Sequence, residues 1–461
     1  TLTAWIDESY ILPIKNETTT TKETNEETYK FKVKVVGVDT PITIKENTPI
    51  DESGANAPVL ASNMIPVYYD ETNEVWKKAN VSNKDTSNPW YSYNSTGEYK
   101  GMWANAVTVT ETNRTTYLNA SPGTEIPMDD ITTMWVWIPR FNAITPSNYN
   151  GGTKTSPGAI DITFVKESET AIDAFTFGDK ELSGFWYAKF ETSHSTLTSS
   201  ATRNNLECTI GTCSNANGII IKPNVHSLRY NNVSNFFYAA RGMKQTGNSF
   251  GFVRSEVDTH MSKNNEWGAV AYLTQSIYGR CTNSTTCSEV GINNNDSYIT
   301  GYGAPAGSSR YATNGAYNTT LGKDASTTGT IYGIYDMSGG TGEFVMGVLV
   351  GTNGKPRSGY DLSSNSGFTG ELNIGGSYTG VTFPDSKYYN LYTTISYTGH
   401  ALIETKSWYS DNGDFISVKY PWFGRGGTYN STSNSAGVFC YVYATGRLSD
   451  GISSRFVITN E

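Results

Sequence analysis

The stretch Gly333-Ile-Tyr-Asp-Met-Ser-Gly-Gly-Thr-Gly-Glu-Phe344 sets apolar residues beside closely spaced glycines. Glycine adopts backbone conformations that other residues avoid, so this pattern predicts a loop folded tightly against a core. Further along, Arg425-Gly-Gly allows a backbone bend before a strand. Arg455-Phe-Val-Ile458 predicts a strand that pairs deep in a sheet and closes the domain.

Outside these stretches, short apolar or aromatic runs alternate with long polar loops. Runs of this length with Gly and Asn punctuation predict a β-rich domain that carries long loop insertions. They occupy residues 59–69, 102–109, 134–141, 159–165 and 184–193. Helical spacing predicts one helix over 258–273, with Asp258 or Thr259 as N-cap, and a second between Ser227 and Met243. The chain contains no short-period repeat, which argues against a solenoid or a propeller.

Changes in composition and residue pattern along the 461 residues predict three segments. Residues 1–50 have two alternating strands around a charged, Thr-rich loop. Two strands do not make a stable sheet alone, so this is a small sandwich remnant, or a stalk or assembly segment that pairs with another domain or chain. Residues 51–130 read as a linker and β-rich lead-in, and residues 131–461 as the main domain.

Six stretches, in the same order, resemble the formylglycine-generating enzymes, or sulfatase-modifying factors, which have a C-type-lectin-like fold. They span roughly residues 135–456, and they are Trp135-Val-Trp-Ile-Pro139, Gly184–Thr192, Ser262–Trp267, Gly333–Phe344, Arg425–Tyr429 and, more loosely, Ser453–Phe456. The resemblance implies an α+β, β-rich fold, with a C-type-lectin-like domain that carries long insertions.

The catalytic residues of that family are missing from the matching region. The enzymes use two cysteines five positions apart, between Arg-Gly-Gly and the final strand, to bind copper. Here that region contains only Cys440, and Ser435 and Thr445 stand five positions to either side. The His-x-x-x-His-x-Glu motif of the related iron-dependent sulfoxide synthases is absent as well. We therefore expect no enzymatic activity and no catalytic residue, and a metal-dependent oxidase is the least favoured function.

The other four cysteines form two close pairs, Cys208 with Cys213 and Cys281 with Cys287. Both pairs lie in Gly/Asn/Ser/Thr-rich stretches that could bring the two residues within bridging distance. We predict two local disulfides and an oxidising compartment. Zinc binding is the alternative, although no His lies close to either pair. The flanks of Cys440 indicate a small buried core residue.

Two further sites contain residue types that could hold a metal or act as an acid–base pair. Members of the resembled family bind structural calcium near the motif that matches residues 333–344. In this sequence Gly340 replaces an Asn of that motif, while Glu343 remains. Structural calcium at Glu343 is thus the one cofactor that the resemblance allows, and we expect no other. His260 and Glu266 could form an acid–base pair, but a hydrogen-bonded His at a helix start is the favoured interpretation.

Composition excludes other classes of function. The net charge of −9 is spread evenly, which argues against nucleic-acid binding. No apolar run approaches the roughly 20 residues of a membrane helix, so we expect no membrane span in this chain. Charged residues make up only 17% and aromatic residues 13% of the chain, so its polar surface comes mainly from Asn, Ser, Thr and Gly.

The resembled fold also serves retroelement-diversified variable proteins, whose variable positions lie between the Arg-Gly-Gly bend and the final strand. Here residues 428–453 are rich in Tyr, Ser, Asn and Gly, as antibody paratopes are. The candidate ligand-contact residues are Tyr429, Asn430, Asn434, Tyr441, Tyr443 and Arg447. The alternative is scaffold, because the whole chain has the same composition.

These features favour a non-enzymatic extracellular or cell-surface protein of a bacterium. We expect an adhesin, or a filament or pilus-like subunit that displays a lectin-like head. Its partner would be a glycan or protein receptor on another surface, with self-assembly through residues 1–50. A phage tail receptor-binding protein with the same fold is the alternative.

Overall fold

The computed structural model describes residues 49–208, 213–351, 356, 366–369, 381–393, 398–431 and 436–460. The strand pair and the assembly role predicted for residues 1–50 lie outside these ranges, apart from Pro49 and Ile50. Asn434 also lies outside them. From Asn47 to Glu461 the chain forms one compact unit.

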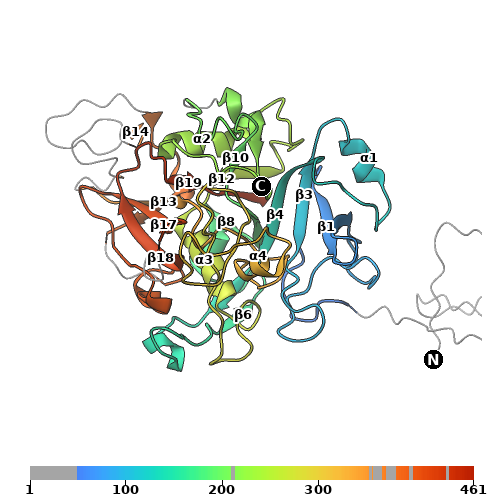
Figure 1. The fold of residues 1–461 in the computed structure, drawn as a ribbon, viewed down its shortest axis with the longest axis horizontal. Helices are drawn as coiled ribbons and strands as arrows, with labels where there is room; N and C mark the ends of the chain where they lie inside the picture. The colour runs from blue at the N-terminus through green and yellow to red at the C-terminus, as the bar shows by residue number, and fades with distance from the viewer. Residues whose placement is uncertain are drawn as a thin grey trace, which may run out of the picture. The chain divides into compact units, whose positions relative to one another are not determined.

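The larger sheet of the described chain is antiparallel and has seven strands (Figure 1). Its spatial order is β12 (Val257–Met261), β20 (Phe456–Asn460), β9 (Gly184–Ala188), β4 (Ile131–Pro139), β3 (Asn105–Val109), β1 (Ile65–Asp70) and β2 (Val75–Lys78). The predicted closing strand is confirmed, because β20 lies inside this sheet, paired with β12 on one side and β9 on the other.

Strands β1 to β3 come from the 51–130 segment and β4 from the segment that follows. The two segments join where β3 pairs with β4, from Asn105 opposite Val136 to Val109 opposite Ile131. Both segments therefore contribute to one continuous sheet.

A smaller sheet lies beside the first and is drawn in orange and red in Figure 1. Strand β13 is central to it: β17 and β18 follow on one side, and β16 and β19 pair with β13 in parallel. The bounds are β13 (Gly342–Leu349), β16 (Asn390–Tyr392), β17 (Trp422–Gly426), β18 (Gly437–Ala444) and β19 (Ile452–Ser454).

Short strand pairs and helices lie in the segments between the strands of the two sheets. The pairs are β5 (Phe141–Ala143) with β6 (Ile162–Phe164), β7 (Thr176–Phe177) with β8 (Lys180–Glu181), β10 (Ser193–His194) with β11 (Ile219–Ile220), and β14 (Phe368–Thr369) with β15 (Val381–Thr382). The α-helices are α1 (Arg114–Asn119), α2 (Val233–Gly242), α3 (Asn264–Thr274) and α4 (Thr320–Asp324). This is the predicted α+β, β-rich fold class. Among the described residues, none of the helices has the length and apolar character to cross a membrane.

The helix predicted over 258–273 is wrong in its first half. Residues 257–261 form β12, and α3 begins only at Asn264. The backbone hydrogen bonds of β12 are made with β20, which is about 200 residues away in the sequence. The local spacing of apolar residues gives no sign of this pairing. Glu266 then accepts a hydrogen bond from the Lys263 backbone N–H at 2.7 Å, which caps the start of α3. The second predicted helix is confirmed as α2, capped by the Asn232 side chain.

Tryptophan side chains form much of the core and fix the loops that cross it. Trp137 and Trp186 pack edge to face with ring centres 5.3 Å apart. Their indole N–H groups donate to the backbone oxygens of Asn56 and Val59, at 3.0 Å and 2.7 Å. Each ring therefore contributes apolar area to the core and also holds the lead-in segment on the sheet.

Candidate binding face

The glycine-rich segment that begins at Gly333 lies in the core, as predicted. Residues 333–341 are all buried, and they lead directly into β13. Gly339 and Gly340 have φ angles of +78° and +67°. A Cβ atom on Gly339 would lie 2.4 Å from the Asn293 carbonyl oxygen, and one on Gly340 would lie 2.6 Å from a Glu191 carboxylate oxygen. Both positions therefore require glycine for conformation and for space.

Glu343 forms a fully buried ion pair with Arg455. The Arg455 Nε and Nη2 atoms donate to the two Glu343 oxygens at 3.1 Å and 2.6 Å, and Nη1 donates to the Ala188 carbonyl at 3.0 Å. Burial lowers the pKa of a guanidinium, but the charge of Glu343 outweighs this and raises the pKa of Arg455. A calcium ion at Glu343 would have to compete with this guanidinium.

Within the described ranges, no group of three or more His, Cys, Asp or Glu side chains is arranged to hold a metal. Structural calcium therefore stays a prediction from the resemblance.

Glu191 lies near this ion pair and is also fully buried. One of its oxygens accepts the Thr341 N–H at 2.8 Å, and the other contacts the Ser227 hydroxyl. Burial, together with the negative charges of Asp336 and Glu343, raises the pKa of Glu191 well above its usual range. The three acids share a region with one arginine, so protonating Glu191 relieves the excess negative charge.

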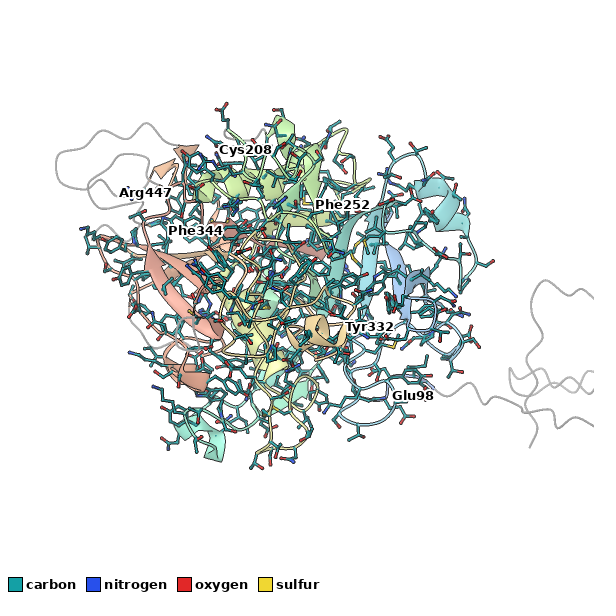
Figure 2. All side chains as sticks on the ribbon, viewed as in Figure 1. Glu98, Cys208, Phe252, Tyr332, Phe344 and Arg447 are labelled. Carbon is teal, nitrogen blue, oxygen red and sulfur yellow. A yellow bond between two sulfur atoms is a disulfide. The ribbon has the colours of Figure 1, made fainter. Side chains whose placement is uncertain are left out.

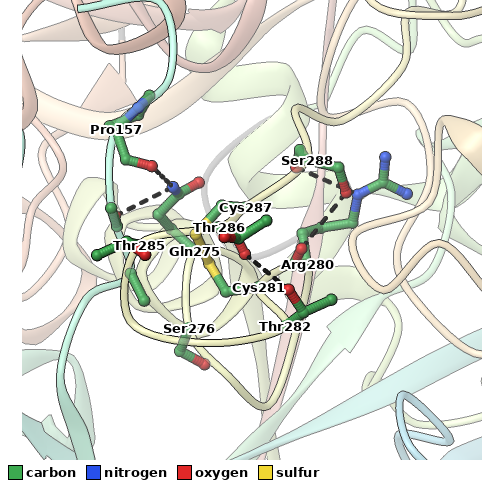
Figure 3. Close-up of a disulfide and its surroundings, with 12 residues drawn as sticks. Pro157, Gln275, Ser276, Arg280, Cys281, Thr282, Thr285, Thr286, Cys287 and Ser288 are labelled. Atoms are coloured by element: carbon green, nitrogen blue, oxygen red, sulfur yellow. Dashed lines mark hydrogen bonds between the residues drawn. A yellow bond between two sulfur atoms is a disulfide. The ribbon is translucent and has the colours of Figure 1, made fainter. Parts of the chain in front are cut away.

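Both predicted disulfides are present, Cys208–Cys213 and Cys281–Cys287. Figure 3 shows the second pair, where the Thr282 N–H donates to the Thr286 carbonyl at 2.9 Å inside the closed loop. Two oxidised pairs are consistent with an extracellular or surface location.

Cys440 lies outside both disulfides and is fully buried in β18, as the sequence predicts. Burial raises the pKa of its thiol. The thiolate, which is the form that attacks carbon or binds copper, is therefore disfavoured at this position.

His260 is also in the core, on β12 and not at a helix start. Its Nε2 lies 3.0 Å from a Glu266 oxygen, and its Nδ1 lies 3.1 Å from an Asp258 oxygen. Burial lowers the pKa of an imidazole, but the two carboxylates outweigh this effect and raise the pKa of His260. The contact with Glu266 links β12 to α3. The His260 side chain is fully buried and does not face solvent.

Loops that are far apart in sequence bring tyrosine and arginine side chains together on one surface. We define it as the loop face. It consists of Arg203, Arg229, Tyr230, Tyr298, Arg310, Tyr311, Tyr429, Asn430 and Asp450.

Arg229 holds three of these loops together. Its Nη1 donates to the Asp450 carbonyl at 2.7 Å and its Nη2 to the Thr202 carbonyl at 2.8 Å. Its guanidinium lies 4.0 Å from the centre of the Tyr298 ring, and that ring packs edge to face on Tyr429 at 4.8 Å. The loops thus meet around one cation and two aromatic rings.

The outer side chains of the loop face are exposed but held in place. Arg203 donates to both Asp450 oxygens, at 2.6 Å and 2.8 Å, and its guanidinium lies 4.6 Å from the Tyr230 ring centre. Tyr311 is 75% exposed and Tyr230 is 36% exposed. The hydroxyls of Tyr311 and Tyr429 raise the pKa of the neighbouring Arg310. Pre-positioned Tyr and Arg side chains are typical of binding hot spots.

The six residues predicted to contact a ligand do not lie together in the structure. Tyr429 is half-buried and Asn430 exposed, both on the loop face, and Asn434 is outside the described residues. Arg447, labelled in Figure 2, is exposed in the segment that leads from β18 to β19. Tyr443 is 45% exposed, lies near the C-terminal end of β18 and stacks on Tyr420 at 4.8 Å.

Tyr441 is fully buried. Its backbone N–H donates to the Asn412 carbonyl at 3.0 Å, and its carbonyl accepts from the Asp414 N–H at 2.9 Å, so residues 412–414 cover this part of β18. Tyr441 is therefore part of the core, where it cannot contact a ligand.

Sequence reasoning missed most of the loop face, namely Arg203, Arg229, Tyr230, Tyr298, Arg310 and Tyr311. They come from the long insertions, where no spacing connects them with residues 428–453. Only the frequency of Tyr in those insertions could have indicated them.

Comparisons with known proteins assign no family to the chain. No protein-family model and no curated protein matches the chain. Among solved structures, the chain is similar to Treponema denticola variable protein 1, with a TM-score of 0.27 and 10% identity over 70% of this chain and 95% of that one. A likeness of that extent does not assign a fold or a function.

Proposed function

We propose that this protein is a non-catalytic binding protein of the bacterial cell surface. In this proposal a C-type-lectin-like head contacts a glycan or protein receptor through the loop face. The observation that carries it is the position of Arg229, which joins three distant loops beneath exposed tyrosine and arginine side chains.

The chemistry of the loop face supports binding in preference to catalysis. Tyrosine offers a large contact area with few rotatable bonds, and arginine offers planar donors for carbonyl, carboxylate and hydroxyl groups. Because Arg203 and Arg229 are already tied to Asp450, little side-chain entropy is lost when a partner binds. Cys440 is too deeply buried for the copper chemistry of the resembled enzymes.

Two roles fit such a head, an adhesin and a filament or pilus-like subunit. The two disulfides support a location outside the cytoplasm for either. Electron microscopy of the full chain separates them, because ordered polymers would support the filament subunit and dispersed particles the adhesin.

The binding test compares tyrosines on and off the loop face. The full chain would be screened on an array of immobilised glycans and on mucin, fibrinogen and collagen. We expect Tyr311→Ala to weaken binding to the best ligand by about tenfold or more, as hot-spot tyrosines do. Tyr443→Ala, an exposed tyrosine off the loop face, should leave it unchanged. Equal effects of the two variants, or no effect of either Tyr311→Ala or Tyr230→Ala, would contradict the proposal.

A further inference from the structure

A cavity of about 290 Å³ opens beside the C-terminal end of α2. Phe237, Tyr238 and Arg241 of this helix line one wall, and Tyr388 lines another. The volume is near the lower end of the range for small-molecule sites in proteins. The cavity is distinct from the loop face, because none of the residues that line it belongs to that face.

The cavity has an excess of positive charge. Arg241, Lys244 and Arg254 line it, and within the described part of the chain the Asp258 carboxylate pairs with the first two. Asp258 pairs with Arg241 and, at 3.3 Å, with Lys244. Arg254 is exposed and makes no hydrogen bond or ion pair with any residue that the structure describes. Among the described residues Arg254 has no carboxylate partner, and its unpaired positive charge favours an anionic ligand.

Arg241 is oriented to present its remaining donors. Its Nη1 donates to Asp258 and, at 2.9 Å, to the Thr259 carbonyl. The guanidinium lies 4.5 Å from the centre of the Tyr388 ring, and the Tyr388 hydroxyl donates to Asp258 at 2.8 Å. Within the described chain Nε and Nη2 have no acceptor. Two such donors on a fixed plane match the paired oxygens of a carboxylate or sulfate.

Three aromatic side chains also line the cavity, together with Cys213, Gly242, Gln245 and Pro384. The Phe237 ring packs edge to face on Tyr388 with ring centres 5.4 Å apart, and Tyr238 follows on the same helix. Such rings attract the partially positive C–H groups on one face of a sugar. A bare inorganic anion would leave this apolar wall unused.

We propose that the cavity binds a single carboxylate or sulfate group carried on a sugar ring, such as a uronic acid or sulfated sugar residue of a glycan. Arg254 and the outer edge of Arg241 contact the anion, and the aromatic wall contacts the ring. The inference rests on the proposed function only in taking the glycan as part of a surface receptor.

The test uses the full chain with defined small probes, read by calorimetry and by ligand-observed NMR. Glucuronate and galactose 6-sulfate carry an anion on a ring, glucose has only the ring, and acetate and inorganic sulfate have only the anion. We expect the first two to bind at least tenfold more tightly than the other three. Arg254→Ala should weaken their binding by about tenfold and Arg254→Glu should abolish it, since a charge-assisted contact is lost and then reversed.

Arg254 is exposed, so both variants should fold, which an unchanged melting temperature would verify. Tyr311→Ala on the loop face is the matched control, and it should bind glucuronate as the wild type does. Equal affinity for glucuronate, glucose and acetate would overturn the proposal, and so would full binding by Arg254→Glu. Equal binding of inorganic sulfate and galactose 6-sulfate would overturn the assignment of a sugar. A loss of receptor binding in Tyr311→Ala concerns only the loop face, so the two proposals can fail separately.

Discussion

Replacing Arg455 by methionine tests the reasoning about the core most directly. Methionine keeps an unbranched side chain but removes the guanidinium that pairs with Glu343. The Glu343 carboxylate is then left fully buried without that partner, in a region that already contains Glu191 and Asp336. The Ala188 carbonyl also loses its donor.

The magnitude follows from the burial of both partners. Removing one partner of a buried pair costs about 3–5 kcal/mol, because the remaining charge is uncompensated. We therefore expect Arg455→Met to lower the free energy of unfolding by about 4 kcal/mol, a large share of the roughly 5–15 kcal/mol of a typical domain. Replacing both partners, Arg455→Met with Glu343→Met, should restore about 2 kcal/mol or more, since an apolar pair carries no unpaired charge.

The assay is equilibrium urea unfolding, followed by tryptophan fluorescence and far-ultraviolet circular dichroism with the disulfides intact. Arg203→Met is the matched control, because Arg203 makes an equally short pair with Asp450 in which both side chains are more than half exposed. That exposed pair should contribute much less to the free energy of unfolding than the buried pair, because water screens it. A loss below about 1 kcal/mol for Arg455→Met, or a double variant less stable than the single one, would refute the reasoning.

Three further outcomes can be measured on the same protein. Folding raises the pKa of Glu191 above that of a glutamate in the unfolded chain, which is about 4.3. The stability that Glu191 contributes is therefore fully present below about pH 4.3 and is lost as the pH rises through the pKa of the folded state. The free energy of unfolding of Glu191→Gln should therefore rise relative to that of the wild type between pH 5 and pH 8, by about 1.4 kcal/mol for each pH unit over which Glu191 titrates. The same pH dependence of the free energy of unfolding in both proteins would contradict this. Cys440 should react with a thiol reagent only after denaturation, because burial raises the pKa of its thiol; rapid labelling of the native protein would contradict this assignment. Replacing Cys281 and Cys287 together by serine should lower the free energy of unfolding by about 2 kcal/mol, the value expected for a loop this short, and an unchanged urea midpoint would argue against it.

The candidate site could be predicted only where it is continuous in sequence. Tyr429 and Asn430 were found because they follow the Arg-Gly-Gly bend, and both lie on the loop face. Arg229 and Tyr298 were missed because they reach that face through tertiary contacts between insertions. Tyr441 belongs to the same strand as Tyr443, yet residues 412–414 cover only the first.

Several features were determined by the sequence alone, because their causes are local. Runs of apolar and aromatic residues specified β4, β9 and β20, short cysteine spacing specified both disulfides, and glycines specified the buried loop before β13. The tertiary structure decided the features that depend on distant partners. Residues 257–261 became a strand because β20 supplies their hydrogen bonds, and the loop face formed because one arginine joins loops that are far apart in the chain. Local pattern fixes which backbone conformation a segment favours, but only the folded chain brings together the groups that satisfy its hydrogen bonds and charges.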